Sequence, residues 1–291
     1  MSHFQTIENF LPKKEFEALM SSLNKLFIKG HDFLGSTAIE SNKEVFRMDE
    51  IEEDIFVPIS IIAGDKGKQV IRSLTGWNGE MISLLELKNF GGYAPLHNMI
   101  SGGFLGSHID HTYANGGNLI HIGNSIFYAT YNWENNWGGE TCFFDNSGFA
   151  ILHTIKPSKN MLLGFVHDCE SFHGVNRISC PPSEQRTTIY MDYYIKAEDL
   201  DNFKSIYLKT SGKKFLYCKY LTTFIPFGRK GNFLASIFSK NFFGYLRNYL
   251  GYLDIKERYV GGTKINYLIL FTLKILNIFL VIGSKLKRLI T

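Results

Sequence analysis

The stretch GGFLGSHIDHTYANGG, residues 102–117, places two histidines and a carboxylate within four positions of an apolar, glycine-flanked segment. Its pattern is that of a strand edge. Residues two apart in a strand point to the same side, so His108 and Asp110 face one way and Ile109 faces the other. An imidazole and a carboxylate on one strand face offer a nitrogen and an oxygen to a common point, which is how a strand presents ligands to a metal ion.

A third metal ligand is expected from another strand of the same barrel. His173, in SFHGVNRI, follows the apolar run MLLGFV and is the strongest candidate. Two histidines and one carboxylate on one side of a metal leave its opposite positions open, as in the facial triad of non-haem Fe(II) oxygenases. We therefore predict that His108, Asp110 and His173 form one catalytic metal site.

The strand QRTTIYMDYY, residues 185–194, indicates an anion site. Arg186, Thr188 and Tyr190 share one face of this strand. A guanidinium inside a barrel is costly unless an anion neutralises it, and an arginine fork binds a carboxylate through two hydrogen bonds. Arg177, in the turn-rich segment after His173, is the less favoured anchor.

The middle of the chain predicts a mainly β fold. Between about residues 81 and 196, β-branched and aromatic runs alternate with Gly, Asn, Pro and Ser; they are EMISLLELKNF, SIFYATYNW, GETCFFD, NMLLGFVH and RTTIYMDYYIK. Several short strands in succession are typical of a jelly roll or barrel. Nearer the N-terminus an amphipathic helix is predicted from apolar residues at helical spacing, namely Phe16, Leu19, Met20, Leu23 and Leu26.

These patterns divide the chain into three parts. Residues 1–80 are expected to form a helical and loop-rich flank, with loops dominating 30–80, and residues 81–196 a double-stranded β-helix (jelly roll) core. Residues 197–291 are expected to form a basic, aromatic, helical extension. Residues 201–291 hold 16 Lys and Arg against 3 Asp and Glu, whereas residues 1–200 hold 15 against 24. This opposite charge indicates different tasks for the core and the extension.

Cysteine usage and the N-terminus favour the cytoplasm. The four cysteines form no C-x-x-C pair and no regular framework, which fits a reducing compartment. The first residues, MSHFQTIENFLPKKEFEALM, lack a charged segment followed by an apolar one, so a secretory signal is not expected.

The order of these motifs resembles that of the 2-oxoglutarate/Fe(II)-dependent oxygenases, specifically their prolyl 4-hydroxylase-like branch. The resemblance covers roughly residues 3–196. It rests on FLPKKEFEAL at the start, GGFLGSHIDH for the first two ligands, FYATYNWENNWGGETCFFD for a tyrosine strand followed by Trp-Gly-Gly-Glu, SFHGVNRI for the distal histidine, and QRTTIYMDYY for the arginine strand.

The resemblance implies an activity and its cofactors. His108, Asp110 and His173 would hold Fe(II), and Arg186, assisted by Thr188, would bind the far carboxylate of 2-oxoglutarate. With O2, such an enzyme hydroxylates an unactivated C–H bond and releases succinate and CO2, with ascorbate as a candidate reductant. The expected substrate is a prolyl side chain of a protein or a small molecule.

One departure from the family pattern concerns the co-substrate. The family often carries a tyrosine about nine residues before the first ligand, where this chain has Met99. Tyr128 is the candidate substitute. Among other polar and aromatic residues, His111 and His121 are expected at the rim of the site rather than as ligands. Trp133 and Trp137 are expected either to line a substrate groove or to pack the barrel.

The C-terminal extension has three alternatives. Residues 267–283 are almost continuously apolar and are broken by Lys274 and Asn277. A narrow polar stripe favours a helix on an anionic membrane surface over one packed on the core, and a central lysine disfavours a membrane span. Residues 263–291 are thus expected to make the protein peripheral at a membrane, with a barrel that folds without the extension and ends near Lys196. Nucleic-acid binding is disfavoured. The alternative function is a non-catalytic, cupin-like module that docks on an anionic surface.

Overall fold

The computed structural model describes residues 4–28, 40–48, 51–87, 94–224, 249–253 and 256. Its helices are α1 (Lys13–Ile28), α2 (Glu53–Ala63), α3 (Asp65–Thr75) and α4 (Leu200–Ser211). Its strands are β1 (Phe4–Ile7), β2 (Glu40–Phe46), β3 (Ile82–Ser83), β4 (Leu96–Ile109), β5 (Tyr113–Ala114), β6 (Leu119–Tyr128), β7 (Thr141–Phe144), β8 (Ile151–Ile155), β9 (Met161–Val166), β10 (His173–Val175), β11 (Arg186–Lys196) and β12 (Thr223–Phe224).

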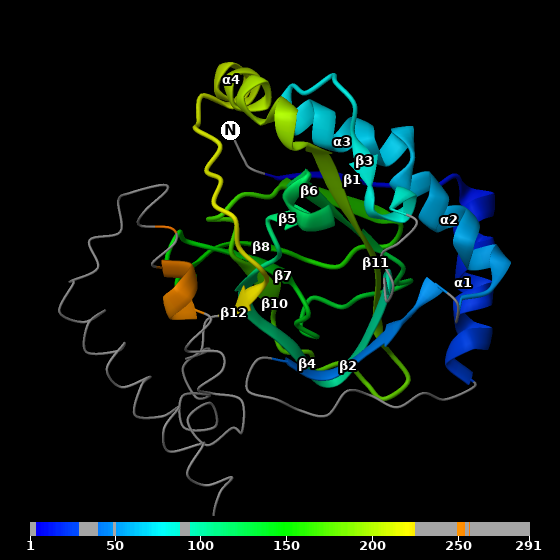
Figure 1. The fold of residues 1–291 in the computed structure, drawn as a ribbon. Coiled ribbons are helices and arrows are strands. Elements are labelled where there is room, and N and C mark those ends of the chain that lie inside the picture. The colour runs from blue at the N-terminus through cyan, green and yellow to red at the C-terminus, as the bar shows by residue number, and fades with distance from the viewer. Residues whose placement is uncertain are drawn as a thin grey trace, which may run out of the picture.

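The strands form one curled antiparallel sheet, which confirms the predicted jelly-roll core (Figure 1). The strand order is β1-β9-β6-β11-β4-β10-β7-β8. The 14-residue strand β4 belongs to both halves of the roll, because its first part pairs with β11 and its second part with β10. This long strand therefore brings the distal histidine strand and the arginine strand to the same barrel.

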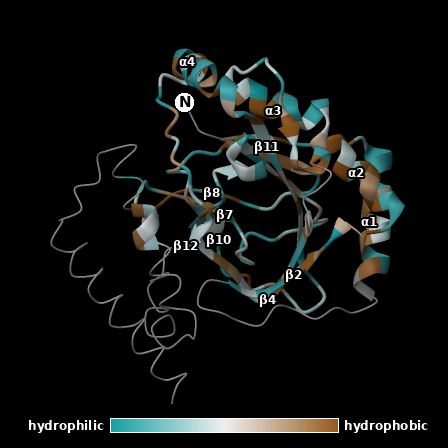
Figure 2. Cartoon of the chain, in the orientation of Figure 1, coloured by the Kyte–Doolittle hydropathy of each residue, from teal (hydrophilic) through white to brown (hydrophobic). Residues whose placement is uncertain are grey.

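Helices α1, α2 and α3 cover one side of the sheet (Figure 1). The five apolar residues predicted to form one face of α1 are all buried. Figure 2 shows hydrophobic and hydrophilic positions alternating along these helices. In α3, Val70 and Ile71 are buried against the sheet. The helical layer thus closes the core on the side away from the candidate ligands.

Two predictions in the N-terminal flank and at its border are wrong. Residues 30–80 were expected to be loop-rich, but α2 and α3 occupy 53–63 and 65–75. The segment EMISLLELKNF was expected to be a strand, but within its described residues, 80–87, the strand is limited to Ile82–Ser83 and a 3-10 turn follows at Leu84–Glu86. Ser83 and Glu86 form a capping box that starts this turn. Three of the other predicted strands contain β7, β9 and β11, and the fourth, SIFYATYNW, overlaps the end of β6 at residues 125–128.

The described part of the C-terminal extension packs on the core. Phe203 and Tyr207 of α4, with Phe215, belong to the main buried cluster. Strand β12 pairs with β4 at Ile109 and His108. The boundary predicted near Lys196 therefore lies inside one packed unit, and the core is continuous with residues 197–224.

The segment 263–291, expected at a membrane surface, lies outside the described residues. Among the helices that the structure does describe, none is both long and apolar enough to cross a lipid bilayer. The expected membrane contact of the extension stays a prediction.

Candidate metal and co-substrate site

Two strands bring the candidate histidines together. His173 begins β10 and lies directly opposite His108 of β4 in the antiparallel register. Their ring centroids are 4.3 Å apart. A Cβ on Gly174 would lie only 2.6 Å from the carbonyl oxygen of Leu105, so glycine allows β10 to approach β4 this closely. Asp110 follows the end of β4, on the same side as His108.

The two histidine rings present the same nitrogen to Asp110. Nδ1 of His108 donates to the carbonyl of Gly106 (2.9 Å), and Nδ1 of His173 donates to that of Ser171 (3.0 Å). Each Nε2 then faces Asp110, at 3.5 Å from Oδ1 for His108 and 3.3 Å from Oδ2 for His173. Metal-bound histidines are held in this way, with the far N–H on a carbonyl.

This donor set fits a divalent metal ion. The ligand atoms of His108, Asp110 and His173 lie within 4.8 Å of one another. A cation between these atoms can replace the ring protons, because two imidazole nitrogens and a carboxylate all present lone pairs to it. Imidazole and carboxylate ligands on one side of an ion suit ferrous iron and leave its other positions open. The residues present therefore fit Fe(II).

The charge state of Asp110 also suits a ligand. Burial by itself would raise the pKa of this carboxyl, but the charges and hydrogen bonds of His173 and His108 hold the pKa well below its ordinary value. Burial, reinforced by His173, lowers the pKa of His108. Asp110 is thus ionised at neutral pH, and metal ligands must be deprotonated.

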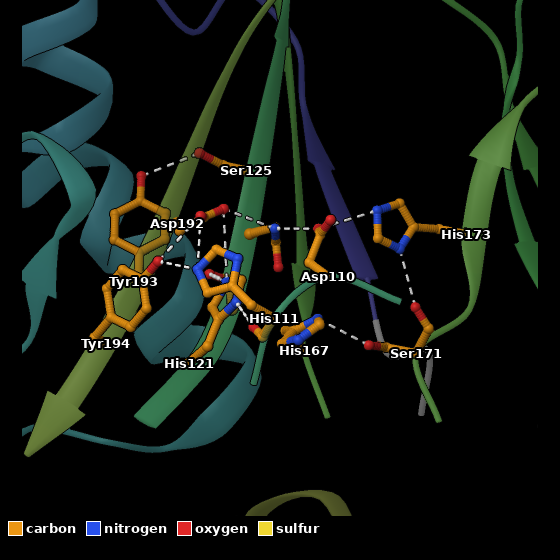
Figure 3. A network of polar contacts seen from close by, with 12 residues as sticks. Asp110, His111, His121, Ser125, His167, Ser171, His173, Asp192, Tyr193 and Tyr194 are labelled. Atoms are coloured by element: carbon orange, nitrogen blue, oxygen red, sulfur yellow. Dashed lines mark hydrogen bonds and ion pairs between the residues drawn. The ribbon is translucent and has the colours of Figure 1, made fainter. Parts of the chain in front are cut away.

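Asn124 orients Asp110, which the sequence analysis did not predict. Its Nδ2 donates to Asp110 Oδ2 at 3.2 Å and to Asp192 Oδ1 at 2.9 Å. Figure 3 shows Asp110 between His173 on one side and Asp192 on the other. Asp192 lies on the strand face of Arg186, Thr188 and Tyr190, so the same two-residue period could have indicated it.

Arg186 supplies a positive charge at another part of the same cavity. Its side chain is buried. It donates from Nε to the carbonyl of Gly139 (2.7 Å) and from Nη2 to the hydroxyl of Thr141 (3.0 Å). Both partners are neutral, so the guanidinium charge calls for an anion in the cavity. Gly139 adopts φ +73, a conformation that favours glycine, so the chain can turn next to the arginine.

Thr141, Tyr128 and Thr188 surround the arginine. The Tyr128 hydroxyl and Thr141 Oγ1 are hydrogen-bonded at 2.6 Å, and the Arg186 guanidinium lies 5.3 Å from the Tyr128 ring centroid. Thr188 lies opposite Tyr128 in the β6–β11 register and lines the cavity, as does Met99. Thr141 was missed by the sequence analysis, although it opens the strand that follows Gly-Gly-Glu.

The two parts of the site share one cavity of about 320 Å³. Polar lining comes from both candidate sets, and Ile126, Phe165 and Val175 add apolar surface. The Phe165 ring lies against His173, with centroids 5.0 Å apart. The cavity therefore joins a metal-ligand set to a cationic anchor through a partly apolar space.

The remaining sequence candidates lie outside this arrangement or differ from expectation. Arg177 is exposed and donates to the carbonyl of Gly102 at 2.7 Å. Trp133 and Trp137 form an edge-to-face pair that packs on the cluster around Met99. The prediction that His121 lies at the rim is wrong, since its side chain is fully buried inside the barrel.

Residues 94–193 match the family model described as the 2OG-Fe(II) oxygenase superfamily. This span contains both candidate histidines, Asp110 and Arg186. A comparison with curated proteins gives no match. The match to the family model confirms the resemblance to the 2-oxoglutarate/Fe(II)-dependent oxygenases that the motifs indicated.

Solved structures with a similar chain path include prolyl hydroxylases. One is a viral collagen prolyl hydroxylase of Paramecium bursaria Chlorella virus-1, a 2-oxoglutarate complex, with 15% identity, a TM-score of 0.44 and coverage of 66% of this chain and 96% of that chain. Another is a Trichoplax adhaerens prolyl hydroxylase bound to a peptide of hypoxia inducible factor, with 17% identity, a TM-score of 0.47 and coverage of 69% and 86%. A third is HygX of Streptomyces hygroscopicus with nickel and 2-oxoglutarate, with 13% identity, a TM-score of 0.44 and coverage of 67% and 84%. At these identities, the substrates named for those proteins do not carry over to this chain.

Proposed function

We propose that this chain, a 2-oxoglutarate- and Fe(II)-dependent dioxygenase whose residues 94–193 match the oxygenase family model, hydroxylates an unactivated C–H bond in a prolyl side chain of a protein. A free small molecule is the second substrate class. The observation that carries the proposal is one cavity with His108, Asp110 and His173 in one part and the buried charge of Arg186 in another.

In the proposed site, each ligand has an assigned task. His108 and His173 offer Nε2 to the iron, and their Nδ1 hydrogen bonds to backbone carbonyls fix the ring orientation. Asp110 supplies the anionic oxygen, and Asn124 fixes its carboxylate. Iron, 2-oxoglutarate and O2 together supply the oxidising chemistry, from which succinate and CO2 are released with the hydroxylated product.

The arginine end positions the co-substrate. Arg186 would bind the carboxylate of 2-oxoglutarate farthest from the iron, with Thr188 as an additional donor. The Gly139 carbonyl and the Thr141 hydroxyl hold the guanidinium plane in place. Tyr128 holds Thr141 in turn through its hydroxyl. We assign Tyr128 a supporting role beside the arginine, because Tyr128 does not line the cavity.

Cavity size supports a side chain as the reacting group. A volume of about 320 Å³ is at the lower end of the range for ligand sites. Once 2-oxoglutarate is in place, the remaining space suits one ring or side chain rather than a large free ligand. The apolar walls at Ile126, Phe165 and Val175 suit the methylene groups of a proline ring.

The experiment is a substrate screen with the iron-loaded full chain. Proline-containing peptides and a set of small molecules are each incubated with 2-oxoglutarate and isotopically labelled O2, and products are analysed by mass spectrometry. We expect peptides that gain one labelled oxygen on proline, and no gain with the Asp110→Ala variant. Labelled small molecules in the absence of any oxidised peptide would show that the prolyl assignment is wrong.

A further inference from the structure

A second cluster of imidazoles and a carboxylate lies behind the first. The ligand atoms of His111, His121 and Asp192 lie within 4.8 Å of one another. His111 follows the iron-ligand segment in the chain, His121 is in β6 and Asp192 is in β11. Figure 3 shows this cluster on the side of Asp110 opposite His173. It has the same residue types as the first site, and the family match assigns it no role.

Hydrogen bonding at His121 leaves a lone pair that faces acceptors. Nδ1 donates to the carbonyl of His111 at 2.8 Å, as the Nδ1 atoms of His108 and His173 donate to theirs. Nε2 then lies 3.6 Å from Asp192 Oδ1 and 3.2 Å from the carbonyl of Gly123. Either neutral tautomer leaves one ring nitrogen lone pair against a carbonyl oxygen. The arrangement is satisfied only by a second ring proton or by a cation at Nε2.

A second imidazole adds an unsatisfied nitrogen beside the cluster. The ring of His167 stacks on that of His121, with centroids 4.0 Å apart. The Ser171 hydroxyl donates to the carbonyl of Asp168, so His167 Nδ1 is the donor in its 3.0 Å bond to Ser171. Within the described residues, His167 Nε2 is buried and has no hydrogen-bond partner. The stacked rings of His121 and His167 therefore each have a buried Nε2 atom without a hydrogen-bond donor among the described residues.

The donors that reach Asp192 do not supply the hydrogen bond that His121 lacks. Asn124 Nδ2 donates to Asp192 Oδ1 at 2.9 Å, and Tyr194 can donate to Asp192 Oδ2 at 3.1 Å. The Tyr194 oxygen lies 2.7 Å from His111 Nε2 and can accept a hydrogen bond from it while the phenolic proton goes to Asp192. The Nε2 atoms of His111 and His121 both lie near the same carboxylate, at 3.7 and 3.6 Å from the oxygens of Asp192.

A metal ion accounts for this geometry better than a proton on His121. One ion can contact a ring nitrogen of His111, a ring nitrogen of His121 and a carboxylate oxygen of Asp192, because these atoms lie within 4.8 Å of one another. Two imidazoles and one carboxylate are a donor set that zinc accepts, with a fourth position for water or a further ligand. His111 and Asp192 line the cavity, which gives an ion a path to the cluster.

We propose that His111, His121 and Asp192 form a second divalent-metal site that takes a zinc-class ion, separate from the His108–Asp110–His173 site and linked to it by Asn124. Asn124 donates to Asp110 and to Asp192 through the same Nδ2. The second ion would lie one side chain behind the iron ligand Asp110. The proposal does not depend on which substrate is hydroxylated.

The test counts zinc ions on the full chain. Each protein is first stripped with a chelator, then titrated with Zn(II) by calorimetry, and the metal retained after desalting is measured. The variants are Asp110→Ala for the first site, His121→Gln and Asp192→Asn for the second, and the Asp110→Ala/Asp192→Asn double variant. His153→Gln, which alters an exposed histidine, is the matched control.

We expect two equivalents of Zn(II) on the unaltered chain and on the control. We expect one on each single-site variant and none on the double variant. Asp192→Asn is nearly isosteric, so it decides the result if the buried His121→Gln variant fails to fold by circular dichroism. The proposal would be overturned if the unaltered chain binds a single equivalent of Zn(II) and Asp110→Ala binds none. That result would favour a second ring proton on His121 instead of a metal ion. A second equivalent that survives Asp192→Asn would also overturn it.

Discussion

Both ring nitrogens of a buried imidazole need a partner, and in His108 and His173 the Nδ1 atom donates a hydrogen bond to a backbone carbonyl. The other nitrogen of each ring is left to face Asp110. The sequence spacing predicted that these three residues meet, because strand residues two apart share a face. The sequence spacing could not predict the contact of Asn124 with Asp110, because the partner of a polar strand residue depends on the register of the sheet.

Asn124 should set the affinity of the first site for iron. Outer partners of metal ligands commonly change metal affinity by about 10–100-fold. We expect Asn124→Ala to raise the Fe(II) concentration for half-maximal succinate formation by that factor, because Asp110 loses its orienting donor. Asn118→Ala, at an exposed position, is the control. An unchanged iron requirement in Asn124→Ala would show that the hydrogen bond to Asp110 does not position it.

Arg186 should set the affinity for 2-oxoglutarate. A hydrogen bond to a charged group contributes roughly 1.5–3 kcal/mol, and about 1.4 kcal/mol corresponds to a factor of ten. Arg186→Ala is therefore expected to raise the KM for 2-oxoglutarate at least tenfold in a co-substrate titration. Arg177→Ala, which removes an exposed guanidinium, should leave this KM unchanged. The opposite ranking would identify Arg177 as the anchor.

At the scale of elements, helix α1 and four of the strands were predictable from the sequence, whereas helices α2 and α3 were not. Alternating or continuous apolar runs marked β6, β7, β9 and β11. Helix α2 has Pro58 within it and apolar residues on most sides, so its sequence lacks a clear amphipathic period. Residues 82–86 look like a strand by composition, but the side chains of Ser83 and Glu86 cap a 3-10 turn instead.

The loop between β9 and β10 carries a carboxyl group whose titration should affect stability. Burial raises the pKa of Asp168 to about 6, although Glu170 donates its backbone N–H to the carboxyl at 2.8 Å. The unfolded value is about 3.9, so the folded state binds the proton more tightly. The free energy of unfolding should therefore fall as the pH rises from about 4 to 6, by on the order of 1–2 kcal/mol after allowance for partial exposure of the side chain.

Denaturant titrations of the unaltered chain and of Asp168→Asn at several pH values measure this effect. The variant keeps an oxygen for the Glu170 N–H but cannot ionise. We expect its stability to exceed that of the unaltered chain at pH 7 and the difference to vanish near pH 4. A difference that stays constant over this range would assign the effect to packing rather than to ionisation.

At the scale of the whole molecule, the core continues past the boundary that composition indicated. The strand signal ends near Lys196, but Phe203, Tyr207 and Phe215 are buried in the same cluster as the helices and the sheet. Tyr252 packs against Phe172, and Lys256 forms a 2.6 Å ion pair with Glu170. Charge and strand periodicity do not report such contacts, because they depend on which surfaces meet after folding.

Two truncations separate the packed part of the extension from residues 263–291. A chain that ends at Lys196 should fail to fold cooperatively, because loss of a buried aromatic side chain costs about 3–5 kcal/mol and the whole domain is stable by only about 5–15 kcal/mol. A chain that lacks 263–291 keeps every described residue and should unfold in one transition. Thermal unfolding followed by circular dichroism tests both expectations.

The same shorter chain tests the membrane prediction. The full chain should float with anionic vesicles, less so at high salt, and the chain without 263–291 should not. In the thermal unfolding experiment, cooperative unfolding of the chain that ends at Lys196 would contradict the conclusion that residues 197–224 are needed for the core. Equal flotation of the full and shorter chains would remove the membrane role of the segment.

Succinate formation from 2-oxoglutarate, measured with and without added Fe(II), tests the central claim most directly. We expect the full chain, after treatment with a chelator, to form succinate only when Fe(II) and O2 are both supplied. Asp110→Ala should form none, and Asp201→Ala, at an exposed carboxylate of α4, should match the unaltered chain. A folded, iron-loaded chain that forms no succinate would contradict the account and would favour the non-catalytic binding module. Full turnover by Asp110→Ala would show that His108, Asp110 and His173 are not the iron site.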